Sequence, residues 1–276
     1  MLSRFYVEEH IKRALVEDIG YGDITTENLT DGAEMMKAEL NTRCDGILCG
    51  RDVFDAVYKV LSDNVEIEFY FKDGDEIKKG DKIADLKGSA KDLLMGERLA
   101  LNYIQRMSGI ATETKKYADK IKPYSAKIAD TRKTTPNFRA FEKYAVKTGG
   151  GMLHRFNLSD CAMLKDNHIK LAGSITNAVK RLRENISFTH KIEVECDTFE
   201  QVKEAVESGC DIIMLDNMAL DTMKQAVEYI NKRAIVEASG NVSLETVNQI
   251  ASTGVDIISS SAIVAKAPTL DLALDM

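Results

Sequence analysis

Length, composition and charge exclude several classes of protein. The chain has 276 residues, 44% of them hydrophobic and 29% charged, which suits one large folded domain or two modest ones. Its net charge of −7 argues against generic nucleic-acid binding, and no apolar run approaches the roughly 18 residues of a membrane helix. Acidic residues occur within residues 1–20, where a secretory signal would be apolar. We therefore expect a cytoplasmic protein with neither a nucleic-acid nor a membrane partner.

The chain before Pro123 predicts helices mixed with antiparallel strands. Apolar residues recur at helical spacing over 3–18, 51–61 and 91–121. Alternating apolar and polar residues, interrupted by glycines, predict antiparallel strands over 34–49 and 65–88. The run DGDEIKKGDKIADLKG in the second of these segments resembles the hairpins of biotinyl and lipoyl carrier domains. It lacks an evident exposed turn with a lysine of the modified kind, so the pattern favours a β-rich packing domain.

After Pro123 the pattern changes to apolar strands that alternate with amphipathic helices. The strands are expected at 126–130, 161–165, 191–196, 211–216, 234–239 and 255–260. Capping signals mark the helices between them: Asp197 with Glu200 predicts one helix start, and Ser243 predicts another. Such a βα repeat predicts a parallel sheet or barrel in an α/β fold.

Polar side chains gather where these predicted strands end, which is where ligands bind in parallel α/β folds. The residues at these ends include Arg132, Lys133, Lys165, Glu195, Asp216, Ser239, Gly240, Ser260 and Ser261. Any one of them alone is more often a solvated charge, a salt-bridge partner or a turn residue. Their convergence on one edge nevertheless predicts an active site.

These residues are suited to two kinds of chemistry. Arginine grips a carboxylate or phosphate with two hydrogen bonds, so a cluster of cations predicts an anionic substrate. The cations near this edge are Arg132, Lys133, His154, Arg155 and Lys165. Glu195 and Asp216 are hard oxygen ligands that suit magnesium. Backbone N–H groups suit a phosphate at Ser239–Gly240, just ahead of an expected helix, and in the loop Gly149–Gly151.

Several longer motifs carry a resemblance to a known family. They are EDIGYGDITTENL (17–29), ERLALNYIQRMSGIAT (97–112), DTRKTTPNFRAFEKYAVKTGGG (130–151), HRFNLSDCAMLKDNHI (154–169), IEVEC (192–196), DIIMLDN (211–217) and EASGN (237–241). In this order they closely resemble the quinolinate phosphoribosyltransferases, also called carboxylating nicotinate-nucleotide pyrophosphorylases. The resemblance implies an α/β fold with an N-terminal α/β sandwich domain (1–108), on which 267–276 pack back, and a C-terminal incomplete TIM-like α/β barrel (109–266).

The resemblance also implies a reaction and the residues that perform it. The family transfers phosphoribosyl from phosphoribosyl pyrophosphate to quinolinate with loss of CO2, giving nicotinate mononucleotide and pyrophosphate for NAD biosynthesis, with Mg2+ as cofactor. The implied catalytic residues are Lys133, Glu195 and Asp216, and the last two would also bind the metal. The implied quinolinate site is Arg106, Arg132, Lys133, His154, Arg155 and Lys165. The implied donor site is Lys165, Glu195, Asp216, Ser239, Gly240, Ser260 and Ser261. A homodimer, or a higher oligomer, would bring Arg106 into the partner's site.

The chain departs from the family pattern at a few positions near this site. Leu153 stands where asparagine is usual, Asn241 where a second glycine is usual, and Ser261 where a turn glycine is usual. We expect altered affinity rather than lost activity from these changes. The alternatives are an enzyme of the same superfamily acting on nicotinate or another aromatic acid, a non-catalytic biotinyl-like binding module, and an inactive paralogue. The full cationic set favours a dicarboxylate substrate, and the charged strand ends disfavour the binding module.

Overall fold

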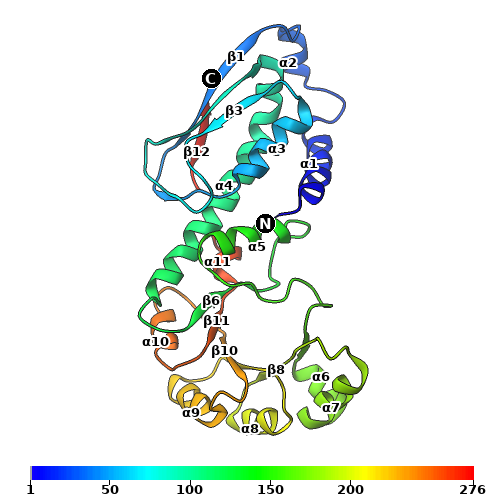
Figure 1. The fold of residues 1–276 in the computed structure, drawn as a ribbon, viewed down its shortest axis with the longest axis vertical. Coiled ribbons are helices and arrows are strands. Elements are labelled where there is room, and N and C mark those ends of the chain that lie inside the picture. The colour runs from blue at the N-terminus through cyan, green and yellow to red at the C-terminus, as the bar shows by residue number, and fades with distance from the viewer. Residues whose placement is uncertain (1) are drawn as a thin grey trace. The chain divides into compact units, whose positions relative to one another are not determined.

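The computed structural model of the protein describes residues 2–276, which form two compact units. Unit 1 contains the chain up to Lys115 together with Ala140–Gly150 and Ala267–Met276, and unit 2 contains Lys116–Arg139 and Gly151–Lys266. Figure 1 shows the elements of each unit in chain order. Helix α4 (Ala90–Lys120) continues without interruption past residue 108, so the domain boundary expected there stays a prediction.

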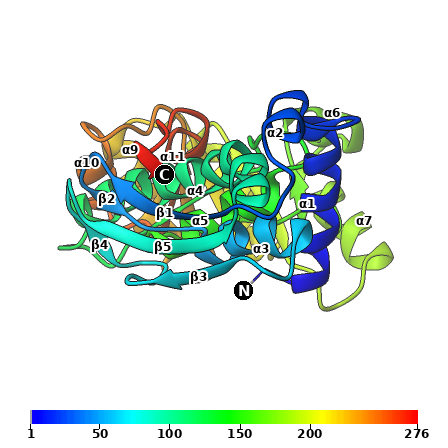
Figure 2. The ribbon, with the colours of Figure 1, turned by 90° about the horizontal axis from the view of Figure 1, so that it is seen from above.

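Unit 1 is built on an antiparallel sheet with α3 and α4 beside it (Figure 2). Its helices are α1 (Arg4–Ile19), α2 (Ile24–Leu29), α3 (Arg51–Leu61), most of α4 and most of α5 (Arg139–Thr148). Its strands are β1 (Met35–Thr42), β2 (Gly46–Ile47), β3 (Glu66–Phe69), β4 (Glu76–Ile77), β5 (Lys82–Ser89) and β12 (Leu272–Asp275). The main sheet has the order β12-β1-β5-β3, so the last strand of the chain returns to the first.

Local sequence explains how unit 1 folds. Helix α1 buries Val7, Ile11 and Leu15, whose spacing of four places them on one face. Asp23 caps α2, because its carboxylate accepts hydrogen bonds from the backbone N–H groups of Thr25 and Thr26 at 3.0 Å. Strand β4 pairs with β2, whereas β5 pairs with β1 and β3. The β4–β5 hairpin that would indicate a carrier domain is therefore not formed.

Unit 2 is a parallel sheet whose strands alternate with helices. Its strands are β6 (Lys127–Ala129), β7 (Ala162–Leu164), β8 (Ile192–Cys196), β9 (Ile212–Asp216), β10 (Ile235–Ser239) and β11 (Ile257–Ser259). Its helices are α6 (Asp166–Ala172), α7 (Ile175–Asn185), α8 (Phe199–Glu207), α9 (Leu220–Ile230), α10 (Val247–Ala251) and α11 (Ala262–Ala265). The strand order is β6-β11-β10-β9-β8-β7. The predicted fold class is confirmed as an α/β protein with an antiparallel sheet domain and a parallel, TIM-like α/β domain.

Two predicted helix starts in unit 2 are wrong by a few residues. The capping box of α8 is formed by Thr198 and Gln201, one position after the expected pair, because the threonine hydroxyl rather than a carboxylate accepts from the helix backbone. Ser243 caps only a turn, with its hydroxyl accepting from the backbone N–H of Glu245 at 3.2 Å. The regular helix α10 then begins at Val247.

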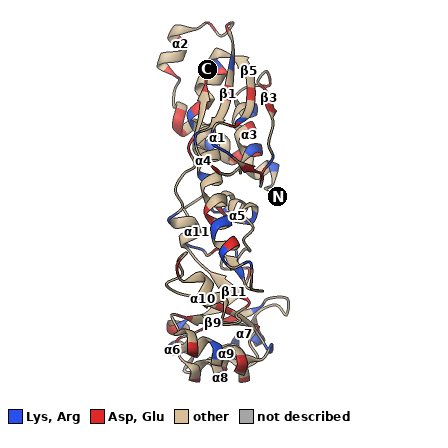
Figure 3. Ribbon diagram, turned by 90° about the vertical axis from the view of Figure 1, so that its left-hand side faces the viewer, with Lys and Arg blue, Asp and Glu red and all other residues tan. Residues whose placement is uncertain are grey.

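The register of the strands decides which side chains share the inner face of unit 2. Glu195 lies opposite Met214, which lies opposite Glu237, and Asp216 lies opposite Ser239. Alternate residues of a strand point to the same face, so Glu193 joins Glu195 there. The helices α6, α8 and α9 contain both basic and acidic residues (Figure 3). No helix within residues 2–276 is long and apolar enough to cross a membrane.

Candidate active site

A cavity of about 720 Å³ opens at the carboxyl ends of the strands of unit 2. It brings together eleven of the twelve residues implicated by the sequence: Arg132, Lys133, His154, Arg155, Lys165, Glu195, Asp216, Ser239, Gly240, Ser260 and Ser261. The sequence did not single out Met163 and Met214, which also line it. The strand ends thus supply cations, carboxylates and hydroxyl groups to one concave surface, which is the arrangement expected of a site for a charged small molecule.

Arg106 lies elsewhere, on α4 in unit 1. Its guanidinium donates to the buried carboxylate of Glu142 at 2.8 Å and to the backbone carbonyl of Ala267 at 2.9 Å. The side chain of Arg106 is 23% exposed, whereas that of Glu142 is fully buried. Arg106 is therefore held from one side by its own subunit, and its role in a partner's site stays a prediction.

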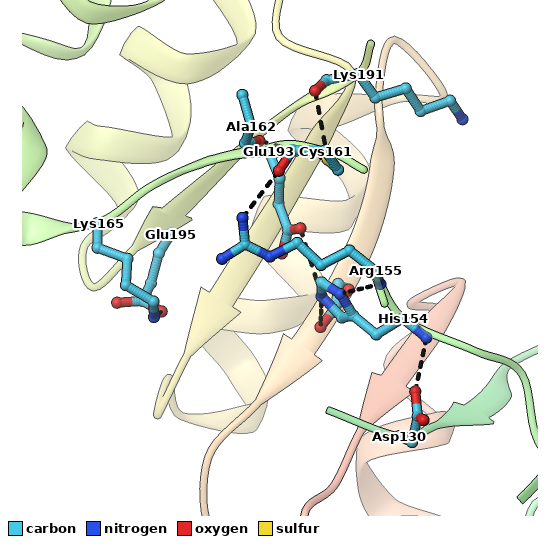
Figure 4. A network of polar contacts seen from close by, with 10 residues as sticks. Asp130, His154, Arg155, Cys161, Ala162, Lys165, Lys191, Glu193 and Glu195 are labelled. Atoms are coloured by element: carbon cyan, nitrogen blue, oxygen red, sulfur yellow. Dashed lines mark hydrogen bonds and ion pairs between the residues drawn. The ribbon is translucent and has the colours of Figure 1, made fainter. Parts of the chain in front are cut away.

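Lys165 and Glu195 form an ion pair at the rim of the cavity (Figure 4). The pair follows from the register, because Leu164 lies opposite Val194 and each is followed by one of the two charged residues. The Lys165 ammonium group donates to Oε2 of Glu195, and the side chains are 45% and 18% exposed. Both groups therefore remain accessible to a ligand in the cavity.

Arg132 lies close enough to two other arginines, Arg155 and Arg139, to be repelled by their charges. Burial, followed by repulsion from Arg155 and Arg139, lowers the pKa of Arg132. Within residues 2–276, the buried Nε of Arg132 has no hydrogen-bond partner. Gathering like charges and leaving a buried donor unpaired both cost free energy, which a bound anion would offset. This cluster is therefore the strongest indication of an anionic substrate.

Sequence reasoning missed Arg139, which braces the loops that carry the other two arginines. Its Nε donates to the hydroxyl of Thr134 at 2.9 Å, and its Nη1 donates to the backbone carbonyl of Phe156 at 3.0 Å. It thus ties the segment after β6 to the segment that contains Arg155. The only sequence signal was its position within the long 130–151 motif.

His154 is anchored beneath the cavity by two buried glutamates that the sequence analysis did not assign a role. Its Nε2 lies 3.4 Å from Glu193 and 3.5 Å from Glu237, whose side chains are 1% and 5% exposed. The backbone N–H of His154 donates to Asp130 at 2.7 Å (Figure 4). Burial lowers the pKa of His154, but the two glutamates raise it by more, to about 10, whereas burial raises the pKa of Glu193.

The ligand atoms of His154, Glu193 and Glu237 lie within 4.8 Å of one another, as in a metal site. The position of the ring proton argues against a metal there. The backbone N–H of Arg155 donates to Nδ1 of His154 at 2.7 Å, which favours a neutral ring whose proton is on Nε2. The two glutamates instead favour a charged ring with a proton on both nitrogens. In both cases Nε2 carries a proton toward the carboxylates, whereas a metal ligand needs a free lone pair there. The cluster is better described as a buried ion-pair network.

Close neighbours explain two glycines near the site. An added Cβ at Gly149 would lie 2.3 Å from the backbone oxygen of Ala111, so this glycine permits close packing inside unit 1. The residues Gly149–Gly151 are not among those that line the cavity, and the phosphate loop expected there stays a prediction. At Gly240 an added Cβ would lie 2.1 Å from Oδ1 of Asn217. The helix expected just after Gly240 starts only at Val247, so that part of the prediction is wrong.

The serines after β11 contribute further polar groups. The Ser260 hydroxyl accepts from the backbone N–H of Ala262 at 3.2 Å and donates to the carbonyl of Val242 at 3.4 Å. Ser259 also lines the cavity, and its buried hydroxyl has no hydrogen-bond partner within residues 2–276. Lys266 lies at the same cavity. Hydroxyl groups and an ammonium group are thus available where the family pattern usually has a glycine turn.

Comparison with known proteins identifies this arrangement. The sequence matches the N-terminal domain of quinolinate phosphoribosyl transferase over residues 23–108 and its C-terminal domain over 110–275. The probable carboxylating nicotinate-nucleotide pyrophosphorylase of Methanothermobacter thermautotrophicus is 41% identical over 96% of this chain and 97% of its own. The Bacillus subtilis protein of the same description is 40% identical over 100% of this chain and 95% of its own.

A solved structure is equally similar. The crystal structure of NadC from Streptococcus pyogenes has 40% sequence identity and a TM-score of 0.97, covering 100% of this chain and 98% of that one. Both domains and their order therefore have counterparts over the full length of the chain. The chain belongs to the quinolinate phosphoribosyltransferase family.

Proposed function

We propose that this protein transfers phosphoribosyl from phosphoribosyl pyrophosphate to quinolinate, releasing pyrophosphate and CO2 and forming nicotinate mononucleotide. One observation carries the proposal beyond family membership: Arg132 and Arg155, which Arg139 braces from behind through Thr134 and Phe156, line the same cavity as Glu195 and Asp216. Quinolinate carries two carboxylates and the donor several phosphate oxygens, so both substrates need cations. The ribose carbon develops positive charge as pyrophosphate leaves, and the two carboxylates suit that charge.

The number of cations favours quinolinate over nicotinate. Nicotinate has one carboxylate, which a single arginine fork can bind. Here Arg132, Arg155, Lys133 and Lys165 all line the cavity, and of these four only Lys165 forms an ion pair with a carboxylate within residues 2–276. A second carboxylate on the ligand would balance the excess positive charge. That balance supports the dicarboxylate.

The residues fit a magnesium ion, which we propose as cofactor. Glu195 and Asp216 end neighbouring strands and line one cavity, and their hard oxygens are the ligands that Mg2+ prefers. They do not form a complete protein cage, which suits an ion that keeps waters and binds substrate phosphate oxygens. When bound, the ion would neutralise charge on the donor's leaving pyrophosphate.

In the proposed mechanism the chain mainly positions charges. The arginine cluster and Lys133 hold the two carboxylates of quinolinate so that its ring nitrogen faces the ribose carbon. Glu195 and Asp216 stabilise the positive ribose while the bond to pyrophosphate breaks. The ring nitrogen then forms the new bond and becomes positively charged. When CO2 leaves from the neighbouring carbon, the electron pair of the broken bond stays on that carbon, where the adjacent positive nitrogen stabilises it until a proton takes the place of the carboxyl group.

We also propose a homodimer in which Arg106 completes the partner's site. The ion pair with Glu142 fixes the orientation of Arg106 on α4, and 23% of the Arg106 side chain stays exposed. A guanidinium that is fixed and still accessible suits contact with a substrate bound in the partner subunit. Mixing Arg106→Met subunits with Lys133→Met subunits tests this. Because one site of each mixed dimer would be intact, about a quarter of the wild-type activity should return. No recovery after verified subunit exchange would contradict the shared site.

We also propose a cytoplasmic location for the protein.

An assay of both products tests the function. Purified protein is incubated with quinolinate and phosphoribosyl pyrophosphate, with and without magnesium, and pyrophosphate and CO2 are measured separately. Equal, magnesium-dependent release of the two is the expected result. Pyrophosphate release with nicotinate, together with no CO2 from quinolinate, would contradict the proposed substrate while leaving the fold and cavity intact.

A further inference from the structure

We propose that Asn241 and Asn217 are positioning residues that fix the Asp216 carboxylate through a relay of side-chain amides. The inference rests on the proposed role of Asp216 in binding the magnesium ion and the donor ribose. Nδ2 of Asn217 donates to Oδ2 of Asp216 at 2.7 Å, and Nδ2 of Asn241 donates to Oδ1 of Asn217 at 3.0 Å. All three residues line the cavity.

The chemistry of the groups fixes the direction of this relay. A carboxylate only accepts hydrogen bonds, so the amide nitrogen of Asn217 has to face Asp216. The amide oxygen of Asn217 then faces away and needs a donor. Asn241 supplies that donor and disfavours a flip of the Asn217 amide, which would turn an oxygen toward the carboxylate. Within residues 2–276 no other hydrogen bond to the Asp216 side chain is found, so its second oxygen remains available to a ligand in the cavity.

Both asparagines are held by a backbone conformation that few residues accept. Asn217 has φ 53° and Asn241 has φ 50°, in the left-handed region where asparagine is tolerated. Gly240 leaves room for the Asn217 amide, because an added Cβ at this glycine would lie 2.1 Å from Oδ1 of Asn217. The backbone N–H of Asn217 also donates to the carbonyl of Ser239 at 2.9 Å. The relay is therefore set before any ligand arrives.

Asn241 supplies the end of the relay that glycine could not supply. Glycine accepts the same φ but carries no amide, whereas asparagine keeps the backbone conformation and adds a donor aimed at Asn217. The inference therefore predicts that the amide of Asn241 has a function beyond fitting the turn.

Glycine variants remove the amides and keep the backbone. We would compare Asn217→Gly, Asn241→Gly and the double variant, with Asn231→Gly as control, because Asn231 also has positive φ, at 44°, but caps α9 outside the cavity. The measurements are KM for phosphoribosyl pyrophosphate, half-saturating magnesium, KM for quinolinate and the melting temperature. From the usual worth of such hydrogen bonds, Asn217→Gly should raise the donor KM roughly tenfold and Asn241→Gly about fivefold.

A double-mutant cycle separates a relay from two independent contacts. If Asn241 acts through Asn217, the double variant should match Asn217→Gly alone, with quinolinate KM and melting temperature close to those of the control. An unchanged donor KM in Asn241→Gly, additive effects in the double variant, or equal rises in both KM values would each overturn the relay. A wild-type protein without magnesium-dependent activity would instead contradict the proposed function.

Discussion

Replacing His154 with leucine should destabilise the protein strongly, because the Nε2–H of this histidine faces two buried glutamates and compensates part of their charge. Glu193 and Glu237 are 1% and 5% exposed, and the His154 ring lies 3.4 and 3.5 Å from them. Leucine has a comparable size but no charge and no donor. The His154 backbone bond to Asp130 survives the change, so the perturbation is confined to the ring.

The expected magnitude follows from the burial of the partners. Removing one member of a buried ion pair costs about 3–5 kcal/mol, since an uncompensated charge stays in a medium of low polarity. Folded proteins have a net stability of about 5–15 kcal/mol, so the variant should lose a large share of it. Protonation of Glu193, whose pKa burial already raises, would offset part of the loss. We therefore expect a loss near the lower end of the range.

Urea unfolding followed by circular dichroism measures this loss. His190→Leu is the matched control, since His190 lies in the loop between α7 and β8 and takes part in no ion pair within residues 2–276. Adding Glu193→Gln and Glu237→Gln to His154→Leu should restore more than half of the stability, because the buried charges are then gone. A loss below about 1 kcal/mol in the single variant would refute the reasoning, since only exposed pairs are worth so little.

Three further changes test other features of the structure. Arg139→Met should raise the KM for quinolinate roughly tenfold through the loss of charged hydrogen bonds, whereas Arg183→Met, which breaks a surface pair with Asp211, should not. Gly149→Ala should lower the free energy of unfolding by about 1–3 kcal/mol, measured in urea, because its Cβ would overlap the oxygen of Ala111. Ser259→Ala should leave stability unchanged or slightly higher, since the buried hydroxyl has no partner within residues 2–276, while a rise in donor KM would show that a ligand uses it.

The rim of the cavity could be predicted from the sequence because strand ends are a local feature. Each apolar strand of unit 2 could be recognised by itself, and a parallel arrangement then brings all its carboxyl ends to one edge. Lys165, Glu195 and Asp216 were found in this way, and the structure places all three at one cavity. The assignment needed no knowledge of the exact register.

The buried pair of Glu193 and His154 next to the cavity could not be predicted in the same way. Glu193 sits inside an apolar strand, and the sequence does not say whether a partner lies opposite it. Its partner His154 comes from a segment far away along the chain, and only the assembled sheet brings the two together. The packing role of Gly149 could not be predicted for a similar reason, since its close neighbour Ala111 lies on α4, far away along the chain. Residues whose role depends on tertiary contacts leave little local signal.

Asn241 shows how a departure from a family pattern acquires a physical meaning. From the sequence alone, an asparagine beside an expected phosphate site predicts altered donor affinity but gives no sign. The structure gives the residue a left-handed backbone and a hydrogen bond to Asn217, which in turn holds Asp216. An ordered carboxylate loses less conformational entropy on binding, so Asn241 should strengthen the donor site. A higher donor KM in Asn241→Gly is therefore the sign that the relay predicts, and a lower donor KM would contradict it.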